Sequence, residues 1–287
     1  MPSDPVPPRR PRPGRRGFGA PVLAVLAALL LAALAGSGVA GAAAGSDDRR
    51  PGPPAVKPTI VFVHGAFADS SGWNTVIGKL LAAGYPALAF SNPLRGPVAD
   101  GEYLKQFLGT IEGPVVLVGH SYGGAVISNG ATDDVKALVF IAAYAPEAGE
   151  SVAQANELGG GHTDVTDHLV LRPYPGAPPG DADATIDPEW FPRLFAQDLP
   201  VSTARVMAAT QRPGALAALV TPSGPPAWTT IPSWYMVAKQ DRIIPPEAER
   251  VMAARAKATT VTVNTSHVPM ISQPDSVMKL ILAAARS

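Results

Sequence analysis

From residue 58 onward, short apolar runs alternate with longer segments whose apolar positions recur at helical spacing. The apolar runs predict β-strands at 59–63, 86–90, 114–118, 135–142, 232–237 and 259–263. The helical spacing predicts helices at 71–83, 100–111, 122–130 and 272–285. Strands that alternate with helices are typical of βαβ units. The sequence therefore predicts an α/β fold with a mostly parallel central sheet and helices on both faces.

A long segment, residues 148–228, interrupts this alternation and is rich in Gly, Pro and Asp. It contains helical stretches at 188–196 and 202–210. A structureless loop of this length is improbable within a compact domain. We therefore expect an inserted helical cap over the carboxyl edge of the sheet, where open α/β sheets bind ligands. The alternative, a flexible linker between two domains, is disfavoured because the remaining chain is short for a second domain.

The N-terminal segment, residues 1–44, has the order of regions found in a secretory signal peptide. A basic, Pro-rich stretch ends at Arg16, an apolar run follows at 20–35, and small residues at 40–44 supply A-x-A cleavage sites. Residues 45–57 are polar and Pro-rich and are interpreted as a linker before a folded domain at 58–287. We therefore expect a secreted or extracytoplasmic protein.

The export route and the fate of the apolar run have alternatives. The pair Arg15-Arg16 before Gly17-Phe18 resembles a twin-arginine signal, so both this route and general secretion stay open. An uncleaved membrane anchor is disfavoured, because the apolar run is short of the roughly 20 residues that a span needs. No stable membrane association is expected after cleavage.

Composition excludes several classes of protein and site. A hydrophobic content of 46% and a charged content of 16% are sufficient for a buried core. The formal net charge is zero, which disfavours a dedicated nucleic-acid binder. The chain has no cysteine, which excludes disulfides, a cysteine nucleophile and Cys-ligated zinc. No metal or organic cofactor is predicted, and the sequence makes no prediction of the oligomeric state.

The motif with the clearest chemistry is VGHSYGG at 118–124, which fits G-x-S-x-G between a predicted strand and a predicted helix. This pattern is typical of a nucleophile elbow, in which a serine sits on an abrupt strand-to-helix turn. Gly119 and Gly123 would give the backbone room to approach on both sides. Ser121 is therefore the candidate nucleophile.

A serine hydroxyl needs a base, and the base needs an acid to orient it. His267 follows the last predicted strand and Asp241 follows the strand before it, so both should reach the same sheet edge as Ser121. The order Ser, Asp, His along the chain is that of α/β-hydrolases. Asp69 and Asp134 are weaker candidates because they follow other strands.

The loop VHGAF at 63–67, after the first strand, is predicted to complete an oxyanion hole. We assign its backbone N–H donors to Ala66 and to Tyr122, the residue after the serine. Gly65 would leave room for the acyl group, and His64 is interpreted as a residue that shapes the loop.

Four segments give the chain a family resemblance: TIVFVHGAFADSSGW (59–73), VGHSYGG (118–124), AAYAPEAGES (142–151) and IPSWYMVAKQDRIIPP (231–246). They resemble bacterial α/β-hydrolases of the branch that includes plant methyl-salicylate esterases and hydroxynitrile lyases. The resemblance covers residues 58–287 and implies a serine hydrolase. The lyases typically have threonine at the position of Gly65 and lysine at that of Val268, so both departures favour an esterase.

We therefore predict a carboxylic ester hydrolase that acts on a small-molecule ester through an acyl-enzyme. A hydroxynitrile lyase, or a cofactor-free perhydrolase or haloperoxidase, would use the same triad and is the alternative within the fold. A non-catalytic secreted binding protein is disfavoured, because all three members of the triad are present. Leu169, Leu171, Trp190, Phe191, Leu194 and Phe195 are expected either to line the pocket or to pack the cap.

Overall fold

The computed structural model describes residues 56–287. The predicted signal peptide and residues 45–55 of the predicted linker lie outside the described residues, so these assignments stay predictions. No helix within residues 56–287 combines the length and the apolar character that crossing a membrane requires.

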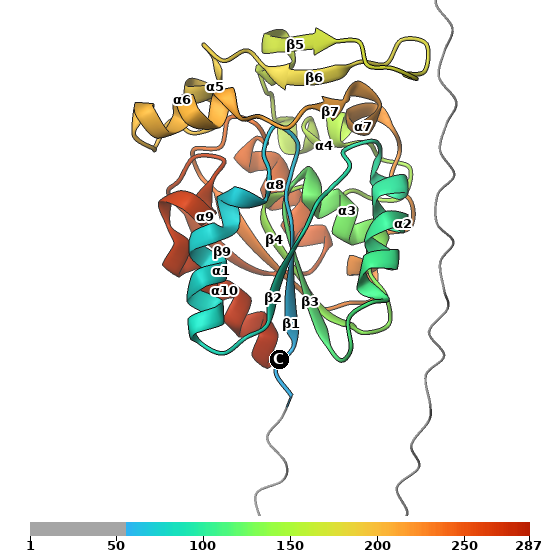
Figure 1. Cartoon of the computed structure of the whole chain (residues 1–287), viewed down its shortest axis with the longest axis vertical. Coiled ribbons are helices and arrows are strands. Elements are labelled where there is room, and N and C mark those ends of the chain that lie inside the picture. Colours follow the sequence, from blue (N-terminus) through green and yellow to red (C-terminus); the bar gives the residue numbers. More distant parts are fainter. Residues whose placement is uncertain (1–55) are drawn as a thin grey trace, which may run out of the picture. The chain divides into compact units, whose positions relative to one another are not determined.

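A six-stranded sheet forms the centre of the molecule, and all its strand pairs are parallel. The spatial order is β2-β1-β3-β4-β8-β9. The strands are β1 (Thr59–Val63), β2 (Ala87–Phe90), β3 (Val115–Ser121), β4 (Val135–Ala143), β8 (Ser233–Ala238) and β9 (Thr259–Val263). This arrangement confirms the predicted α/β fold. All carboxyl ends of the strands consequently meet at one edge, the upper edge in Figure 1.

Helices cover both faces of this sheet (Figure 1). On one side α1 packs against α10, and on the other α2 packs against α3. Helix α8 connects β8 to β9 and packs against β8. The helices are α1 (Asn74–Ala82, preceded by the 3₁₀ turn Ser70–Trp73), α2 (Pro97–Leu108), α3 (Tyr122–Gly130), α8 (Pro246–Arg255), α9 (Pro269–Ser272) and α10 (Pro274–Arg286).

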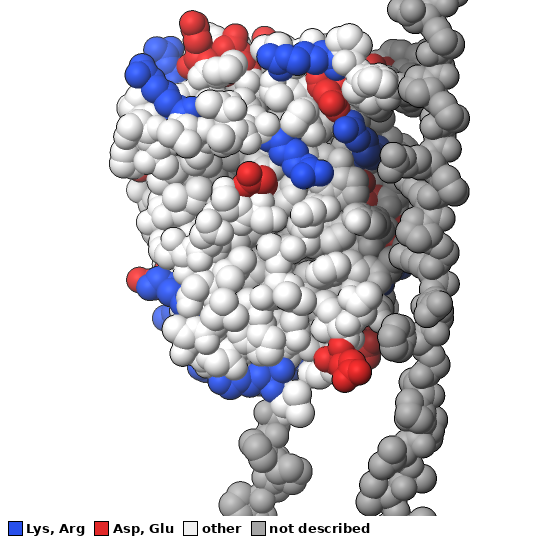
Figure 2. Space-filling view, viewed as in Figure 1, with Lys and Arg blue, Asp and Glu red and all other residues white. Residues whose placement is uncertain are grey.

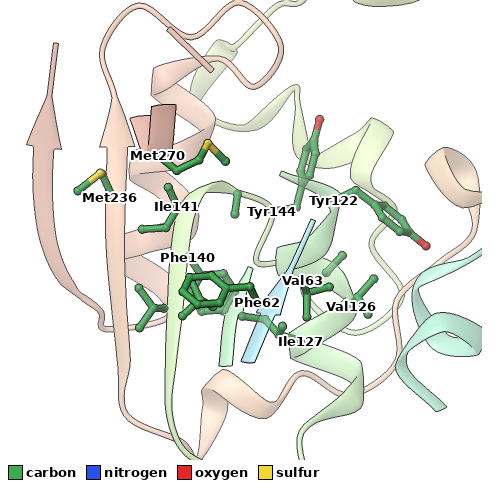
Figure 3. Close-up of a cluster of buried hydrophobic side chains, with 14 of the residues drawn as sticks. Phe62, Val63, Tyr122, Val126, Ile127, Phe140, Ile141, Tyr144, Met236 and Met270 are labelled. Atoms are coloured by element: carbon green, nitrogen blue, oxygen red, sulfur yellow. The ribbon is translucent and has the colours of Figure 1, made fainter. Parts of the chain in front are cut away.

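The core is densest around β3 and β4, because strands covered by helices on both faces must be apolar on both faces. Every residue of β3 is buried, including the polar pair His120 and Ser121 at its end. Phe140 of β4 stacks on Tyr235 of β8, with the ring centroids 5.7 Å apart. Figure 3 shows part of this cluster, which extends up to Tyr122 and Tyr144 at the carboxyl edge. The edge that carries the functional groups therefore rests on a rigid apolar layer.

The segment 148–228 lies over the carboxyl edge of the sheet (Figure 1). The predicted helices are present, but the segment also contains a three-stranded antiparallel sheet that the sequence analysis did not predict. Its elements are α4 (Val152–Ala155), β5 (Leu169–Arg172), β6 (Asp183–Ile186), α5 (Phe191–Leu194), α6 (Val201–Ala209), β7 (Gly214–Ala215), α7 (Leu216–Val220) and the 3₁₀ turns Leu158–Gly160, Val165–His168 and Ala227–Thr229. We call this segment the cap.

Charged side chains on the face shown in Figure 2 gather around the cap and near the end at which the strands begin. The surface between these two zones is largely uncharged, and both signs occur in each zone. This mixture agrees with the formal net charge of zero. The face shown therefore offers no stripe of single sign to a polyanion.

Candidate active site

The turn from β3 into α3 holds Ser121 in a strained backbone conformation. Its φ is 54° and its ψ is −128°, which a non-glycine residue rarely adopts. A Cβ at position 119 would lie 2.7 Å from the Gly123 carbonyl oxygen, and one at position 123 would lie 2.2 Å from the Val63 carbonyl oxygen. Both positions therefore require glycine, as the elbow motif predicted.

Ser121 opens into an apolar cavity of about 300 Å³ beneath the cap. Ala66 and Tyr122 line the same cavity, so the structure brings the predicted nucleophile and both predicted oxyanion donors together. Neither backbone N–H donates to a carbonyl in the turns and loops of residues 56–287. A Cβ at position 65 would lie 2.5 Å from the Ser121 Cβ, so Gly65 lies directly against the serine. The cavity can therefore present two backbone donors beside one hydroxyl.

The loop that carries Ala66 is fixed by hydrogen bonds to neighbouring segments. The backbone N–H of Asn92 donates to His64 Nε2 (3.1 Å), so the proton of the neutral ring is on Nδ1, which donates to the Gly65 carbonyl (2.9 Å). Burial, the largest influence, lowers the pKa of His64 and favours this neutral ring. Phe67 has a φ of 61° and donates its N–H to the Arg212 carbonyl of the cap. His64 therefore shapes the loop, as expected, and is not positioned as a base.

Tyr122 is held in place through its side chain. Its hydroxyl donates to Asp100 Oδ2 (2.7 Å), which also accepts from the backbone N–H of Arg95 (3.0 Å). Burial raises the pKa of Asp100, while these hydrogen bonds oppose that shift. The Arg95 side chain in turn pairs with Asp183 of the cap strand β6 at 2.5 Å. Asp100 thus anchors the residue that carries one predicted oxyanion donor, a contact that the sequence analysis missed.

His267 and Asp241 meet as predicted. His267 Nδ1 lies 2.5 Å from Asp241 Oδ2, and both side chains are fully buried. Asp241 Oδ1 accepts the backbone N–H groups of Ile243 (2.7 Å) and Ile244 (3.0 Å). Since the Asp241 carboxylate can only accept, it requires the proton on His267 Nδ1 and leaves Nε2 as the basic atom.

The rings of His120 and His267 pack against each other, and His120 is the residue directly before Ser121. Their centroids lie 4.6 Å apart, and His120 Nε2 donates to the His267 carbonyl at 2.7 Å. Burial, the largest influence, lowers the pKa of His120 well below its usual value, so this ring is neutral. His267 Nε2 is buried and has no hydrogen-bond partner among residues 56–287, and it makes no hydrogen bond to Ser121 Oγ. Such bonds often tighten only when substrate binds.

Neither of the weaker acid candidates pairs with His267, whose Nδ1 faces Asp241. Asp69 accepts the backbone N–H of Ser71 and begins a 3₁₀ turn. Asp134 immediately precedes β4, so it lies at the opposite edge of the parallel sheet. In the cap, exposed His162 pairs with Asp164. His168 stacks on Trp190, with the centroids 3.6 Å apart.

The cap residues proposed for the pocket divide into two groups. Leu169 and Leu171 line the cavity at Ser121, whereas Phe191 and Leu194 are buried in cap packing. Phe195 presents its ring to His267 in an edge arrangement at 4.8 Å. The cap therefore both lines the cavity and covers the histidine.

Asp198 of the cap holds the loop that carries His267, and it is a second residue that the sequence analysis missed. It accepts both the backbone N–H (2.9 Å) and the hydroxyl (2.5 Å) of Ser266. Nothing in the local sequence around Asp198 indicates this contact, because its partner is 68 residues away. Within residues 56–287, no group of three or more His, Asp or Glu side chains could hold a metal ion.

Comparison with known proteins identifies the family of the chain and agrees with its fold. The model of a family described as the alpha/beta hydrolase family matches residues 60–280. The alpha/beta hydrolase nvfD of Aspergillus novofumigatus is 26% identical, and the alignment covers 80% of this chain and 97% of that protein. Polyneuridine aldehyde esterase superposes with a TM-score of 0.67 at 21% identity, covering 79% of this chain and 99% of that one. A pyrethroid hydrolase from Sphingobium faniae superposes with a TM-score of 0.65 at 21% identity, covering 80% and 98%.

Proposed function

Because this chain belongs to the alpha/beta hydrolase family, we propose that it is a serine hydrolase that cleaves carboxylic esters with Ser121, His267 and Asp241. The observation that carries the proposal is the strained Ser121 at an apolar cavity that Ala66 and Tyr122 also line, in a fold that pairs His267 with Asp241 in buried contact. Family membership alone would leave the activity open, since a fold hosts many functions.

In the proposed reaction, His267 Nε2 takes the Ser121 hydroxyl proton while Oγ attacks the ester carbonyl carbon. The backbone N–H groups of Ala66 and Tyr122 bind the oxyanion that forms. Asp241 keeps the Nδ1 proton in place and stabilises the imidazolium. His267 then returns the proton to the leaving alcohol, and an acyl-enzyme remains on Ser121.

A water molecule releases the acid in the second half of the reaction. His267 Nε2 takes a proton from the water as its oxygen attacks the acyl carbon, and the same two backbone donors bind the second oxyanion. His267 then returns the proton to Ser121 Oγ as the acyl bond breaks. The chain's own residues therefore account for every proton transfer.

An apolar ester is the substrate class that best fits the cavity. The lining is mainly aliphatic and aromatic, and it includes Leu169, Leu171, Leu216, Leu219 and Ile243. The cavity volume lies at the lower end of the range for small-molecule sites. One structural neighbour is an esterase and another hydrolyses pyrethroids, which suggests small hydrophobic esters for this chain as well.

Two positions favour hydrolysis over a hydroxynitrile lyase reaction. Position 65 has no room for a side chain beside Ser121 in this backbone. The residue after His267 is the buried, uncharged Val268, so no cation follows the histidine there. These are the two positions at which the resembling lyases typically have threonine and lysine.

The proposal is tested by p-nitrophenyl esters of increasing acyl length and by labelling with a fluorophosphonate. The wild-type protein should hydrolyse short or medium esters and take up one label, whereas Ser121→Ala should do neither and remain folded. The loss in kcat should be about 10⁶-fold, as when the serine of a comparable triad is removed. Hydrolysis that survives Ser121→Ala would remove the serine from its proposed role.

We also propose that the protein is exported, on the strength of the N-terminal sequence alone. The mature N-terminus should fall within residues 41–46, as measured by N-terminal sequencing of the protein outside the cell. Recovery of the full-length chain in washed membranes would instead favour the anchor.

A further inference from the structure

A second acidic side chain, Glu249 of α8, is completely buried behind the candidate site. Its Oε2 accepts the backbone N–H of Ala238 at 2.8 Å, at the end of β8. Its Oε1 is also buried and accepts no hydrogen bond from a donor among residues 56–287. An ionised carboxylate with one such hydrogen bond would be strongly unfavourable in this environment. Glu249 therefore needs either a proton or a further partner.

The acidic neighbour of this carboxyl group is Asp241, whose backbone N–H donates to the carbonyl of Ala238, the residue whose own N–H Glu249 accepts. Burial is the largest influence on Glu249 and the charge of Asp241 the second, and together they raise the pKa of Glu249 well above its usual value. Two neighbouring carboxyl groups that are both buried strongly disfavour ionising together, so one of them holds a proton.

The hydrogen bonds decide which carboxyl group holds that proton. Asp241 accepts two backbone N–H groups, from Ile243 and Ile244, and faces His267 Nδ1 as a third donor. Glu249 accepts a single backbone N–H. Donors favour the charged form of a carboxyl group, so the negative charge belongs on Asp241 and the proton on Glu249.

We propose that Glu249 is a positioning residue that, as a neutral carboxylic acid, donates a hydrogen bond from Oε1 to the Asp241 carboxylate. This hydrogen bond holds Asp241 ionised and oriented toward His267, and it favours the arrangement in which the shared proton stays on His267 Nδ1. The Glu249 proton does not leave during turnover. The proposal rests on the proposed function, because Glu249 would act by positioning Asp241, one of the three proposed catalytic residues.

Other titratable groups around Glu249 are accounted for. Tyr144 donates its hydroxyl to Asn156 and Tyr235 donates its hydroxyl to the Ala143 carbonyl. Burial raises the pKa of both tyrosines above the usual value, so they stay neutral in moderately alkaline solution. Arg250, on the same helix, slightly opposes the shift of Glu249. The carboxyl group of Glu249 is therefore the one expected to lose its proton first as the pH rises.

The first test compares the pH profiles of wild type and Glu249→Gln. A glutamine can accept the Ala238 N–H and donate an N–H to Asp241, but it cannot ionise. The wild-type kcat/KM should fall at alkaline pH, because Glu249 then ionises and places a second negative charge beside Asp241. Glu249→Gln should lack this fall. Glu247→Gln, an exposed change on the same helix, should keep the wild-type profile. Identical profiles for wild type and Glu249→Gln would overturn the proposal.

The second test removes the donor with Glu249→Leu. We expect kcat to fall about 10- to 100-fold relative to Glu249→Gln, with little change in KM, because a hydrogen bond to a charged group is lost. Glu247→Leu should leave kcat unchanged. A folded Glu249→Leu protein with the kcat of Glu249→Gln would contradict the positioning role. If Glu249→Leu does not fold, the pH profile of Glu249→Gln decides the question.

A third measurement separates this proposal from the proposed function. A carboxyl group whose pKa is raised by folding makes the folded state less stable as the pH rises from its usual value to the raised one. The free energy of unfolding of wild type should therefore decrease over that range relative to Glu249→Gln, whether or not any ester is hydrolysed. A constant difference would show that Glu249 is not protonated in the fold. Failure of fluorophosphonate labelling alone would instead count against the proposed function.

Discussion

The carboxyl edge of the sheet and the cap contribute different things to the same cavity. The sheet edge supplies polar atoms held by short, buried hydrogen bonds, as at Asp241 and His267. The cap supplies apolar side chains, some of which, such as Leu171, are half exposed. Reacting atoms must be placed to within a fraction of an ångström, whereas an apolar wall needs only approximate shape. We therefore expect sheet-edge substitutions to change kcat and cap substitutions to change KM.

The largest effect within this comparison is expected for Asp241→Asn. The side chain keeps its shape but loses the charge that stabilises the imidazolium, and the same change in a comparable triad lowers kcat about 10⁴-fold. KM should change little, because the substrate does not contact Asp241. Steady-state kinetics with a p-nitrophenyl ester would measure both. Asp69→Asn is the matched control and should retain activity; the reverse pattern would place the acid at Asp69.

A smaller loss of kcat is expected for Gly65→Ala, which should displace the loop 63–67 that carries the Ala66 N–H. The new Cβ would meet the Ser121 Cβ at 2.5 Å, so the loop or the serine must move. Loss of one oxyanion donor lowers kcat by about 10²- to 10³-fold. Gly78→Ala is the control, because a Cβ there has no neighbour within 4 Å. A change in KM alone would show that the loop tolerates the methyl group.

Asp198→Ala tests whether a cap substitution can also change kcat. Asp198 belongs to the cap, but it holds the loop of His267. Removing it leaves the Ser266 N–H and hydroxyl without their acceptor. We expect kcat to fall about 10-fold, the equivalent of about 1.4 kcal/mol, which is of the size that one net hydrogen bond contributes. Asp164→Ala, at an exposed cap position, should have no effect. An effect of Asp198→Ala on KM alone would mean that the two regions act independently.

The smallest effect on kcat is expected for Leu169→Ala, which tests the contribution of the cap to substrate binding. Loss of apolar contact should raise KM for longer acyl chains about 10-fold and leave kcat nearly unchanged, since ground state and transition state lose the same contact. Leu81→Ala, on the exposed side of α1, is the control. A drop in kcat for short and long esters alike would show that the cap also positions reacting atoms.

The parts of the fold that sequence reasoning located best are those with local, continuous patterns. The predicted strands 59–63 and 259–263 match β1 and β9, and the predicted helix 122–130 matches α3. The helix predicted at 100–111 begins three residues earlier, because Pro97 fits the first turn after Gly96. Local periodicity is sufficient to predict an element that belongs to the sheet or packs against it along its full length.

The sequence analysis did not predict elements that are rich in charged residues or strands whose partners are distant in the sequence. Helix α8 carries four charged residues in ten, and its fully buried Glu249 reads as a surface position in the sequence. Strands β5 and β6 pair across a Pro- and Gly-rich turn and expose part of their apolar residues. The stability of these strands depends on packing in the cap, which no local sequence pattern indicates.

The candidate site was likewise predicted only in part. The topology rule for parallel sheets placed Ser121, Asp241 and His267 at one edge, and the structure brings Asp241 and His267 into contact. The supporting residues Asp100, Asp198 and Glu249 were missed, because each acts on a partner in another element. A single sequence carries no sign of such a contact.

The strained backbone of Ser121 has a consequence for how such a protein can change over generations. A residue held at positive φ with this ψ destabilises the fold by about 1–3 kcal/mol, and glycine would relieve most of that. Selection for stability alone would therefore favour glycine at position 121, so the strained serine is a cost that the proposed activity would explain. The buried apolar layer beneath the turn offsets that cost.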